Sequence, residues 1–311
     1  MSEPESRTLM RLDKRIAQLF GLSRRAAQQA VRQGQVDVNG QPCLEPALEV
    51  EPQAQLVYDA NRPRAGTTAR RLHVLYEDPQ ILIVNKPARV LTQPTPARER
   101  DTLLERAGRY LARKHGHKRP YVGIVHRLDQ DTTGVILMVA NARALRPFQA
   151  MFRAHAVERR YLGVVEGVFL AAPGRIDMPL VGDRGDGRRG VTRDPSLGVP
   201  AVTHFKVLET FGQTASMVEC RLETGRTHQI RIHLAEIGHP VVGDPVYRPR
   251  ADPRFPVPFG RQALHAQSLR FIHPFSHESI DVQAPLPADL IELVAELRDR
   301  FGSWSGVPGQ L

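Results

Sequence analysis

The segment Val122-Gly-Ile-Val-His-Arg-Leu-Asp-Gln-Asp-Thr-Thr-Gly-Val-Ile-Leu-Met-Val139 decides how this 311-residue chain is interpreted. Two short apolar runs, typical of buried strands, bracket a mostly polar stretch from His126 to Gly134. A carboxylate beside a buried strand is costly to desolvate unless cations or hydrogen-bond donors accompany it. Asp129 has His126 and Arg127 beside it. The pattern therefore fits either a structural salt bridge or a reactive carboxylate.

A second polar cluster lies in Leu222-Glu-Thr-Gly-Arg-Thr-His-Gln-Ile-Arg-Ile-His-Leu234. In a strand, the two isoleucines and Leu234 would share one face, and Gln229, Arg231 and His233 would share the other. We expect this strand to present a polar face that can meet a carboxylate. A half-exposed strand without any part in a site gives the same alternation.

Strand and helix patterns are mixed through residues 71–301. Leu72–Tyr76 and Ile81–Val84 are predicted strands, Asp101 is placed to cap a helix, and Leu290–Leu297 has the apolar spacing of a last helix. No regular βαβ repetition is present, which favours an α+β fold. We expect a mixed, largely antiparallel β-sheet with flanking helices.

The first part of the chain indicates a separate small α/β domain. Leu12, Ile16, Leu19 and Phe20 have helical spacing, and a second short helix follows Ser23. Asn-Gly at positions 39 and 40 is a strong signal for a tight hairpin. The predicted parts are a small domain at 8–59, a linker at 60–70, a larger domain at 71–301 and a flexible tail at 302–311.

Charge is segregated within the small domain. Its two helices carry six basic residues against one acid, Asp13, whereas residues 33–59 contain acids and no base. This favours a phosphate-binding surface on the helices, although an ordinary charged surface is the alternative. The six basic residues predicted to contact phosphates are Arg11, Lys14, Arg15, Arg24, Arg25 and Arg32.

Composition narrows the class of protein. The chain has 43 basic and 33 acidic residues, a formal charge of +10, which makes a polyanion the default partner. Nearly all the bases are arginines, a bias that a GC-rich genome also produces. Two cysteines exclude a disulfide scaffold and a cysteine-based zinc site. No apolar run reaches membrane length and the first residues are polar, so we expect a cytoplasmic protein without a membrane partner.

Metal and nucleotide sites are not indicated. His126, Asp129, His228 and His233 are possible ligands, but the spacing of the last two puts them on opposite faces of a strand. The chain has no Gly-Lys-Ser/Thr phosphate loop, dinucleotide fingerprint or Gly-x-Ser-x-Gly elbow. We therefore expect no metal, no nucleotide and no other cofactor.

Two resemblances carry the prediction of function. Arg11-Leu-Asp-Lys14, Ser23-Arg24 and the segment from Gln33 to Gly40 resemble the small RNA-binding module named after the fourth small-subunit ribosomal protein. The rest resembles the RluA-type pseudouridine synthase family. Its motifs occur in order as Tyr76-Glu-Asp78, Val84-Asn-Lys-Pro87, His126-Arg-Leu-Asp129, Asp131-Thr-Thr-Gly134, Arg160-Tyr161, Thr224-Gly-Arg-Thr-His-Gln-Ile-Arg231, Gly238-His-Pro240, Gly243-Asp244 and Leu264-His-Ala266. Departures from the family pattern at Ala88, Thr133 and Leu162-Gly163 concern substrate fit and not reaction type.

The second resemblance implies an RNA uridine isomerase that needs no cofactor. By resemblance Asp129 is the catalytic carboxylate, Arg231 its cationic partner, and Tyr161 the residue that stacks on uracil and assists proton loss from C5. Leu264 would form an apolar wall, and Arg127 would occupy the space left by an extruded uridine. The remaining predicted substrate-binding residues are His126, Arg226, His228 and Gln229.

The expected substrate is large-subunit ribosomal RNA, with transfer RNA as a second possibility, and the expected working unit is a monomer. Two other functions fit parts of the sequence. One is an RNA-binding or ribosome-assembly protein whose isomerase domain has lost activity. The other is a metal-dependent RNA phosphodiesterase that uses Asp129, Asp131 and the histidines.

Overall fold

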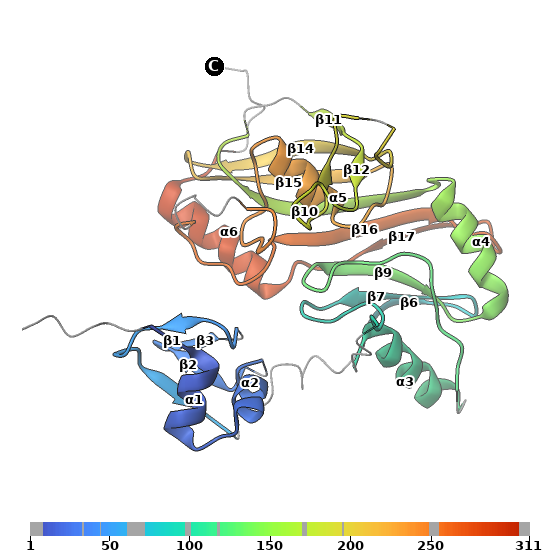
Figure 1. The fold of residues 1–311 in the computed structure, drawn as a ribbon. Coiled ribbons are helices and arrows are strands. Elements are labelled where there is room, and N and C mark those ends of the chain that lie inside the picture. The colour runs from blue at the N-terminus through green and yellow to red at the C-terminus, as the bar shows by residue number, and fades with distance from the viewer. Residues whose placement is uncertain are drawn as a thin grey trace, which may run out of the picture. The chain divides into compact units, whose positions relative to one another are not determined.

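The computed structural model describes residues 9–32, 34–43, 45–60, 72–96, 101–116, 119–169, 173–194, 196–248 and 255–304 (Figure 1). The chain divides into two compact units, Met1–Arg71 and Leu72–Leu311. Residues 61–70 of the predicted linker and 305–311 of the predicted tail lie outside the described residues. Each unit is described by itself.

The first unit packs two helices on short strands. Its elements are β1 (Met10–Arg11), α1 (Leu12–Phe20), α2 (Arg24–Arg32), β2 (Val36–Val38), β3 (Gln41–Cys43), β4 (Glu49–Val50) and β5 (Leu56–Tyr58). The strands pair as β3-β2-β5 and β1-β4. Asn39 and Gly40 both have positive φ and join β2 to β3, which confirms the predicted hairpin. Leu12, Ile16 and Val31 are fully buried in the core of this unit.

A ten-stranded sheet organises the second unit, in the order β11-β14-β15-β10-β16-β9-β7-β6, with β17 beside β16 and β8 beside β9. Its strands are β6 (His73–Glu77), β7 (Ile81–Lys86), β8 (Gly123–Ile124), β9 (Thr133–Val139), β10 (Val157–Glu166), β11 (Gly174–Asp177), β14 (Val202–Phe211), β15 (Ala215–Leu222), β16 (Leu264–Ile272) and β17 (Ser279–Gln283). Strands β9 and β16 run parallel, and the other described pairs of this sheet are antiparallel. A separate ribbon pairs β12 (Leu180–Val181) with β13 (Gly190–Val191).

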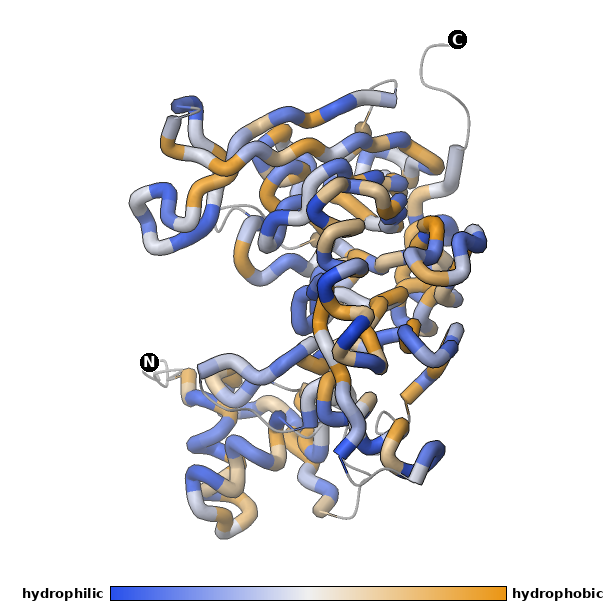
Figure 2. The backbone as a smooth tube through the Cα atoms, turned by 90° about the vertical axis from the view of Figure 1, so that its right-hand side faces the viewer, coloured by the Kyte–Doolittle hydropathy of each residue, from blue (hydrophilic) through white to orange (hydrophobic). Residues whose placement is uncertain are grey.

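Both faces of the sheet are covered. Along β7 and β9 alternate side chains belong to two different apolar clusters, which explains why these strands read as continuous apolar runs. Helix α3 (Leu103–His115) and α6 (Ala288–Phe301) contribute to one cluster, and α4 (Ala142–Arg153) contributes to the other. Figure 2 shows hydrophobic stretches along the strands and mostly hydrophilic loops at the margins. The fold is α+β, as predicted.

Two local predictions are wrong. Residues Gln229–Glu236 form a helix, α5, and not a strand. Residues 229–234 are all buried, so the segment lacks the one-sided apolar stripe that identifies a helix in sequence. Asp101 does not cap α3, because Thr102 accepts the hydrogen bond from the Glu105 amide, while Asp101 pairs with Arg106. Among the described residues, no helix has the length and apolar character needed to cross a bilayer.

Candidate active site

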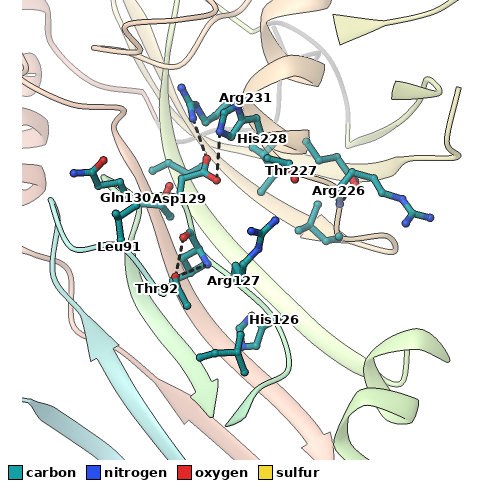
Figure 3. Close-up of a pocket in the computed structure, with 18 of the residues that line it drawn as sticks. Leu91, Thr92, His126, Arg127, Asp129, Gln130, Arg226, Thr227, His228 and Arg231 are labelled. Atoms are coloured by element: carbon teal, nitrogen blue, oxygen red, sulfur yellow. Dashed lines mark hydrogen bonds and ion pairs between the residues drawn. The ribbon is translucent and has the colours of Figure 1, made fainter. Parts of the chain in front are cut away.

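The loop from Val125 to Thr132 joins β8 to β9 and carries Asp129. Thr92 fixes its centre through two hydrogen bonds with Leu128: its hydroxyl donates to the Leu128 carbonyl at 2.9 Å and accepts from the Leu128 amide at 3.3 Å (Figure 3). At the start of the loop, His126 Nε2 accepts a hydrogen bond from the Leu137 amide at 2.9 Å. Burial, followed by the charge of Arg159, lowers the pKa of His126 to about 3. His126 is therefore neutral and serves as an acceptor that anchors the loop.

The end of the loop depends on a close approach between β9 and β16. Gly134 has φ of 110°, and a Cβ at this position would lie 2.1 Å from the carbonyl oxygen of Ala266. Only glycine leaves room for the parallel pairing of these two strands. The pairing brings Leu264, at the start of β16, to the cleft that Asp129 also lines.

Lys86 supports the same loop from inside the protein. Its side chain is fully buried, and Nζ donates to the carbonyl oxygens of Gln130 at 2.7 Å and Pro87 at 2.9 Å. Burial lowers the pKa of Lys86 to about 7, although the nearby charges of Asp131 and Asp129 oppose this shift. The peptide that follows Asp129 is therefore held by a buried donor.

Asp129 meets an arginine from α5. Arg231 Nη1 donates to Asp129 Oδ2 at 3.0 Å, across 102 positions of sequence. The same guanidinium donates through Nε and Nη2 to both oxygens of Asp244, at 2.6 and 2.9 Å. Asp244 is fully buried and also accepts from the backbone amides of Val246 and Tyr247. Burial opposes the charge of Arg231, but Asp244 and Asp129 outweigh it and raise the pKa of Arg231.

His228 stands on the other side of the carboxylate. Its Nε2 lies 3.8 Å from Asp129 Oδ1, and its Nδ1 lies 2.7 Å from the hydroxyl of Tyr247. Figure 3 shows Arg231 and His228 converging on Asp129. Burial lowers the pKa of His228, against the opposing influence of Asp129. A neutral imidazole can accept a hydrogen bond from the Tyr247 hydroxyl at Nδ1 and turn its Nε2–H toward Asp129.

Asp129, His228 and Arg231 line a cleft of about 1320 Å³. The cleft is bounded by residues 91–96, the 124–132 loop, the C-terminal part of α4 and residues 225–231. It is larger than the roughly 300–1,000 Å³ of typical small-molecule pockets, which suits a segment of a polymer. The sequence-predicted residues that line it are His126, Arg127, Asp129, Tyr161, Arg226, His228, Gln229, Arg231 and Leu264.

Comparisons with known proteins match this geometry. Residues 80–236 match the family model described as RNA pseudouridylate synthase, and residues 10–56 match the S4 domain. The chain belongs to the RNA pseudouridine synthase family. It is therefore an isomerase that acts on RNA.

Two curated relatives and one solved structure resemble the synthase over most of their length. YlyB of Bacillus subtilis (strain 168), described as an RNA pseudouridine synthase, is 40% identical, with 93% of this chain and 94% of the relative covered. Ribosomal large subunit pseudouridine synthase D of Escherichia coli (strain K12) is 35% identical, with 96% and 93% covered. The solved structure of human RNA Pseudouridylate Synthase Domain Containing 1 is 27% identical, with a TM-score of 0.57, and covers 74% of this chain and 95% of its own.

One of the predicted substrate-binding residues of the synthase, Gln229, uses its hydrogen-bonding atoms within the protein. Gln229 is 2% exposed, and its Nε2 donates to Val202 O and Thr203 Oγ1, both at 3.0 Å. Its Oε1 accepts from the Thr224 hydroxyl at 2.7 Å and from the Arg226 amide at 3.0 Å. The amide is therefore used in full to hold the turn that precedes α5. Gln229 positions Arg226 and α5 instead of offering hydrogen bonds to a ligand.

Sequence reasoning gave no role to several residues that build the site. Lys86 and Asp244 belong to family motifs quoted above. Their charged side chains within these motifs were the available indication that they help to build the site. Thr92 and Tyr247 carried no signal, because their partners lie far along the chain or depend on the turn after Asp244. Among the described residues, no three histidine, cysteine or acidic side chains come together in a way that could hold a metal ion.

In the first unit, the six predicted RNA-contacting residues fall into two groups. Arg11 donates through Nε and Nη2 to the fully buried Asp13, at 3.1 and 2.9 Å, and Arg15 donates to the carbonyl oxygens of Glu51 and Pro52. These two side chains thus serve the fold of the unit. Lys14, Arg24, Arg25 and Arg32 are exposed and stand on α1 and α2, and Arg24 also approaches Asp13, with 3.8 Å between Nε and Oδ2.

Proposed function

We propose that this synthase converts uridines of large-subunit ribosomal RNA to pseudouridine, with Asp129 as the catalytic carboxylate and without a cofactor. The observation that carries the proposal is the ion pair between Asp129 and Arg231 at 3.0 Å in the wall of a large cleft. The substrate class rests on relatives that are named ribosomal large subunit pseudouridine synthase D.

The reaction is an internal rearrangement. The N1–C1′ bond of uridine breaks, uracil turns, C5 bonds to C1′, and the proton on C5 leaves as N1 gains one. No electrons or groups are exchanged with a second molecule, so the balance requires no redox cofactor or group donor. Attack at C1′, addition to the base and removal of a sugar proton all require an ionised carboxylate next to the nucleoside. Arg231 supplies the positive charge that such a partly buried anion needs.

Tyr161 is the proposed second catalytic residue. It is 7% exposed on β10 and lines the cleft, where its ring can stack on an extruded uracil. Burial raises the pKa of Tyr161, so its hydroxyl keeps its proton at neutral pH. The hydroxyl would therefore act as a relay: its oxygen takes the C5 proton as its own proton passes to water, and water supplies the proton that N1 gains. Leu264 supplies an apolar wall, and exposed Arg127 fills the space that the uridine leaves.

The S4 unit would add affinity by raising the effective concentration of RNA near the cleft. All the residues proposed for catalysis come from one chain, so a monomer suffices as the working unit. Transfer RNA is the alternative substrate, and the test below distinguishes it.

The test compares the full-length protein with Asp129→Ala on unmodified transcripts of large-subunit ribosomal RNA and of transfer RNAs. Wild type should form pseudouridine at defined positions of the ribosomal transcript, and Asp129→Ala should lower the rate by about 10³-fold or more. Asp281→Ala, which removes an exposed carboxylate on β17 outside the cleft, is the matched control and should behave as wild type.

Three results would contradict the proposal. Equal pseudouridine content with wild type and Asp129→Ala would remove catalysis from Asp129. Modification of transfer RNA alone would make the substrate assignment wrong. Strand cleavage that a chelator abolishes would indicate a metal-dependent phosphodiesterase instead of an isomerase.

A further inference from the structure

Arg159 is a buried arginine of the cleft that the reaction described above does not use. It lies on β10 two residues before Tyr161. Both residues line the cleft, and Arg159 is only 7% exposed. Arg160, between them, points outward and pairs with Glu158 at 2.6 Å.

The guanidinium of Arg159 is held by neutral groups. Its Nη2 donates to the Glu223 carbonyl oxygen at 3.3 Å, and its Cζ lies 5.9 Å from the centre of the Phe152 ring. Its Nε is buried and has no hydrogen-bond partner among the described residues. A Cβ at position 225 would lie 2.5 Å from Nη1, so Gly225 leaves the space that this guanidinium fills. The described groups that contact the guanidinium thus leave room for it but carry no opposite charge.

Arg159 differs in this respect from the other buried arginines. Four arginines in the described part of the chain are less than 9% exposed: Arg106, Arg159, Arg231 and Arg261. Arg106 pairs with Asp101, Arg231 with Asp244 and Asp129, and Arg261 with Asp289. Arg159 alone among these four has no ion pair with a described carboxylate. Burying a charge without a counterion is costly, and Arg231 already neutralises the nearby Asp129.

We infer that Arg159 binds a backbone phosphate of the RNA inside the cleft, next to the uridine that stacks on Tyr161. The inference rests on the proposed function, because that function makes RNA the occupant of the cleft. A planar guanidinium matches a phosphate with two parallel hydrogen bonds, whereas the described protein groups accept one hydrogen bond from Arg159, through Nη2. His126, whose ring stacks on Phe152 with 4.6 Å between ring centres, is neutral and does not compete for the anion.

Other basic side chains of the cleft can contact the same RNA strand. Arg127, Arg153 and Arg226 line the cleft and are exposed, so they offer positive charge to a strand that enters from solvent. Arg159 differs from these three arginines because it is buried. Burial lowers the pKa of Arg159, which a bound phosphate would oppose.

The test measures how salt affects binding. Full-length wild type, Arg159→Met, Arg159→Lys and Arg160→Met are titrated onto one unmodified large-subunit ribosomal RNA transcript between about 50 and 200 mM KCl. Arg159→Met should flatten the slope of log Kd against log salt concentration by about 0.7–0.9, the value of one lost phosphate contact. It should raise Kd about 5- to 20-fold at the lowest salt and raise KM more than it lowers kcat. Arg159→Lys should restore the slope but only part of the affinity.

Arg160→Met is the matched control, since it removes the neighbouring arginine from the outer face of the same strand. Its slope should equal that of wild type. Circular dichroism at the assay temperature identifies any variant that has not folded, and Arg159→Gln, which also removes the charge and should flatten the slope by the same amount, replaces Arg159→Met if that variant fails to fold.

If Arg159→Met binds more weakly but keeps the wild-type slope, the inference is wrong and a neutral partner, such as a uracil carbonyl, is favoured. The inference is also wrong if Arg159→Lys does not restore the slope that Arg159→Met loses. The proposed function can fail independently: if wild type binds the transcript but forms no pseudouridine, the slope comparison still decides whether Arg159 meets a phosphate.

Discussion

Each unit of the synthase contains a fully buried aspartate side chain that is paired with an arginine, and these two pairs are built alike. In the first unit, Asp13 is fully buried and accepts hydrogen bonds from Arg11 Nε and Nη2 and from Gln28. In the second unit, Asp244 is fully buried and accepts from Arg231 Nε and Nη2 and from two backbone amides. Taken by themselves, both are structural salt bridges.

The difference lies in the third nitrogen of each guanidinium. The Arg11 side chain is 45% exposed, and its described hydrogen bonds go to Asp13. The Arg231 side chain is 5% exposed, and its Nη1 reaches a second carboxylate, Asp129, in the cleft. A buried pair thus becomes part of a site when its arginine is enclosed, fixed on two sides, and left with one donor that faces the substrate. The comparison predicts that the two pairs will respond differently to the same changes.

Replacing Arg231 should have the largest effect. Arg231→Met leaves Asp244 buried without its cation and Asp129 without its partner, which should cost about 3–5 kcal/mol of unfolding free energy. Pseudouridine formation should fall by about 10³-fold or more, because the carboxylate loses both its orientation and its positive neighbour. Chemical denaturation and single-turnover rates on the ribosomal transcript measure the two effects.

A buried arginine outside the cleft provides the control. Arg106, on α3, is 5% exposed, pairs with Asp101 and is not among the residues that line the cleft. Arg106→Met should lower stability while it preserves the rate per folded molecule. If Arg231→Met retains the wild-type rate per folded molecule, Arg231 serves the fold alone and the contrast with Arg11 disappears.

Asp13→Asn should affect only the stability of the first unit, by about 1–2 kcal/mol at neutral pH, since Arg11 is partly screened by solvent. The hydrogen bond from Arg11 is the main cause that lowers the pKa of Asp13 to about 2, from an ordinary value of 3.8. This stabilisation is present above about pH 4 and is lost as the pH falls through 2. The variant should therefore lose acid sensitivity of unfolding in that range.

Asp244→Asn is the matched change in the second unit. It should lower pseudouridine formation at saturating RNA, because Arg231 loses its anchor, whereas Asp13→Asn should keep the wild-type rate. Equal effects of the two variants on the rate would show that the third nitrogen of Arg231 makes no difference.

Many of the structural features in this comparison could be predicted from the sequence. Those that could not were missed for physical reasons. Local signals sufficed for the Asn39-Gly40 hairpin, and the motif resemblance brought Asp129 and Arg231 together although they are 102 positions apart. The helix at α5 was missed because burial on every side removes the periodicity on which such predictions rest. Asp13 was counted as a surface charge, because the sequence does not reveal that Arg11 and Gln28 enclose it.

The smallest expected effect tests the exposed charges of the first unit against the enclosed charge of the second. Arg25 is exposed on α2, so Arg25→Ala should change unfolding free energy by no more than about 0.5 kcal/mol. An exposed phosphate contact contributes about 1 kcal/mol or less, so the affinity for the ribosomal transcript should fall no more than about fivefold. The slope of log Kd against log salt concentration should flatten by about 0.7–0.9, with kcat unchanged. A changed kcat would mean that the S4 unit does more than hold RNA near the cleft, and an unchanged slope would remove Arg25 from the RNA-contacting surface.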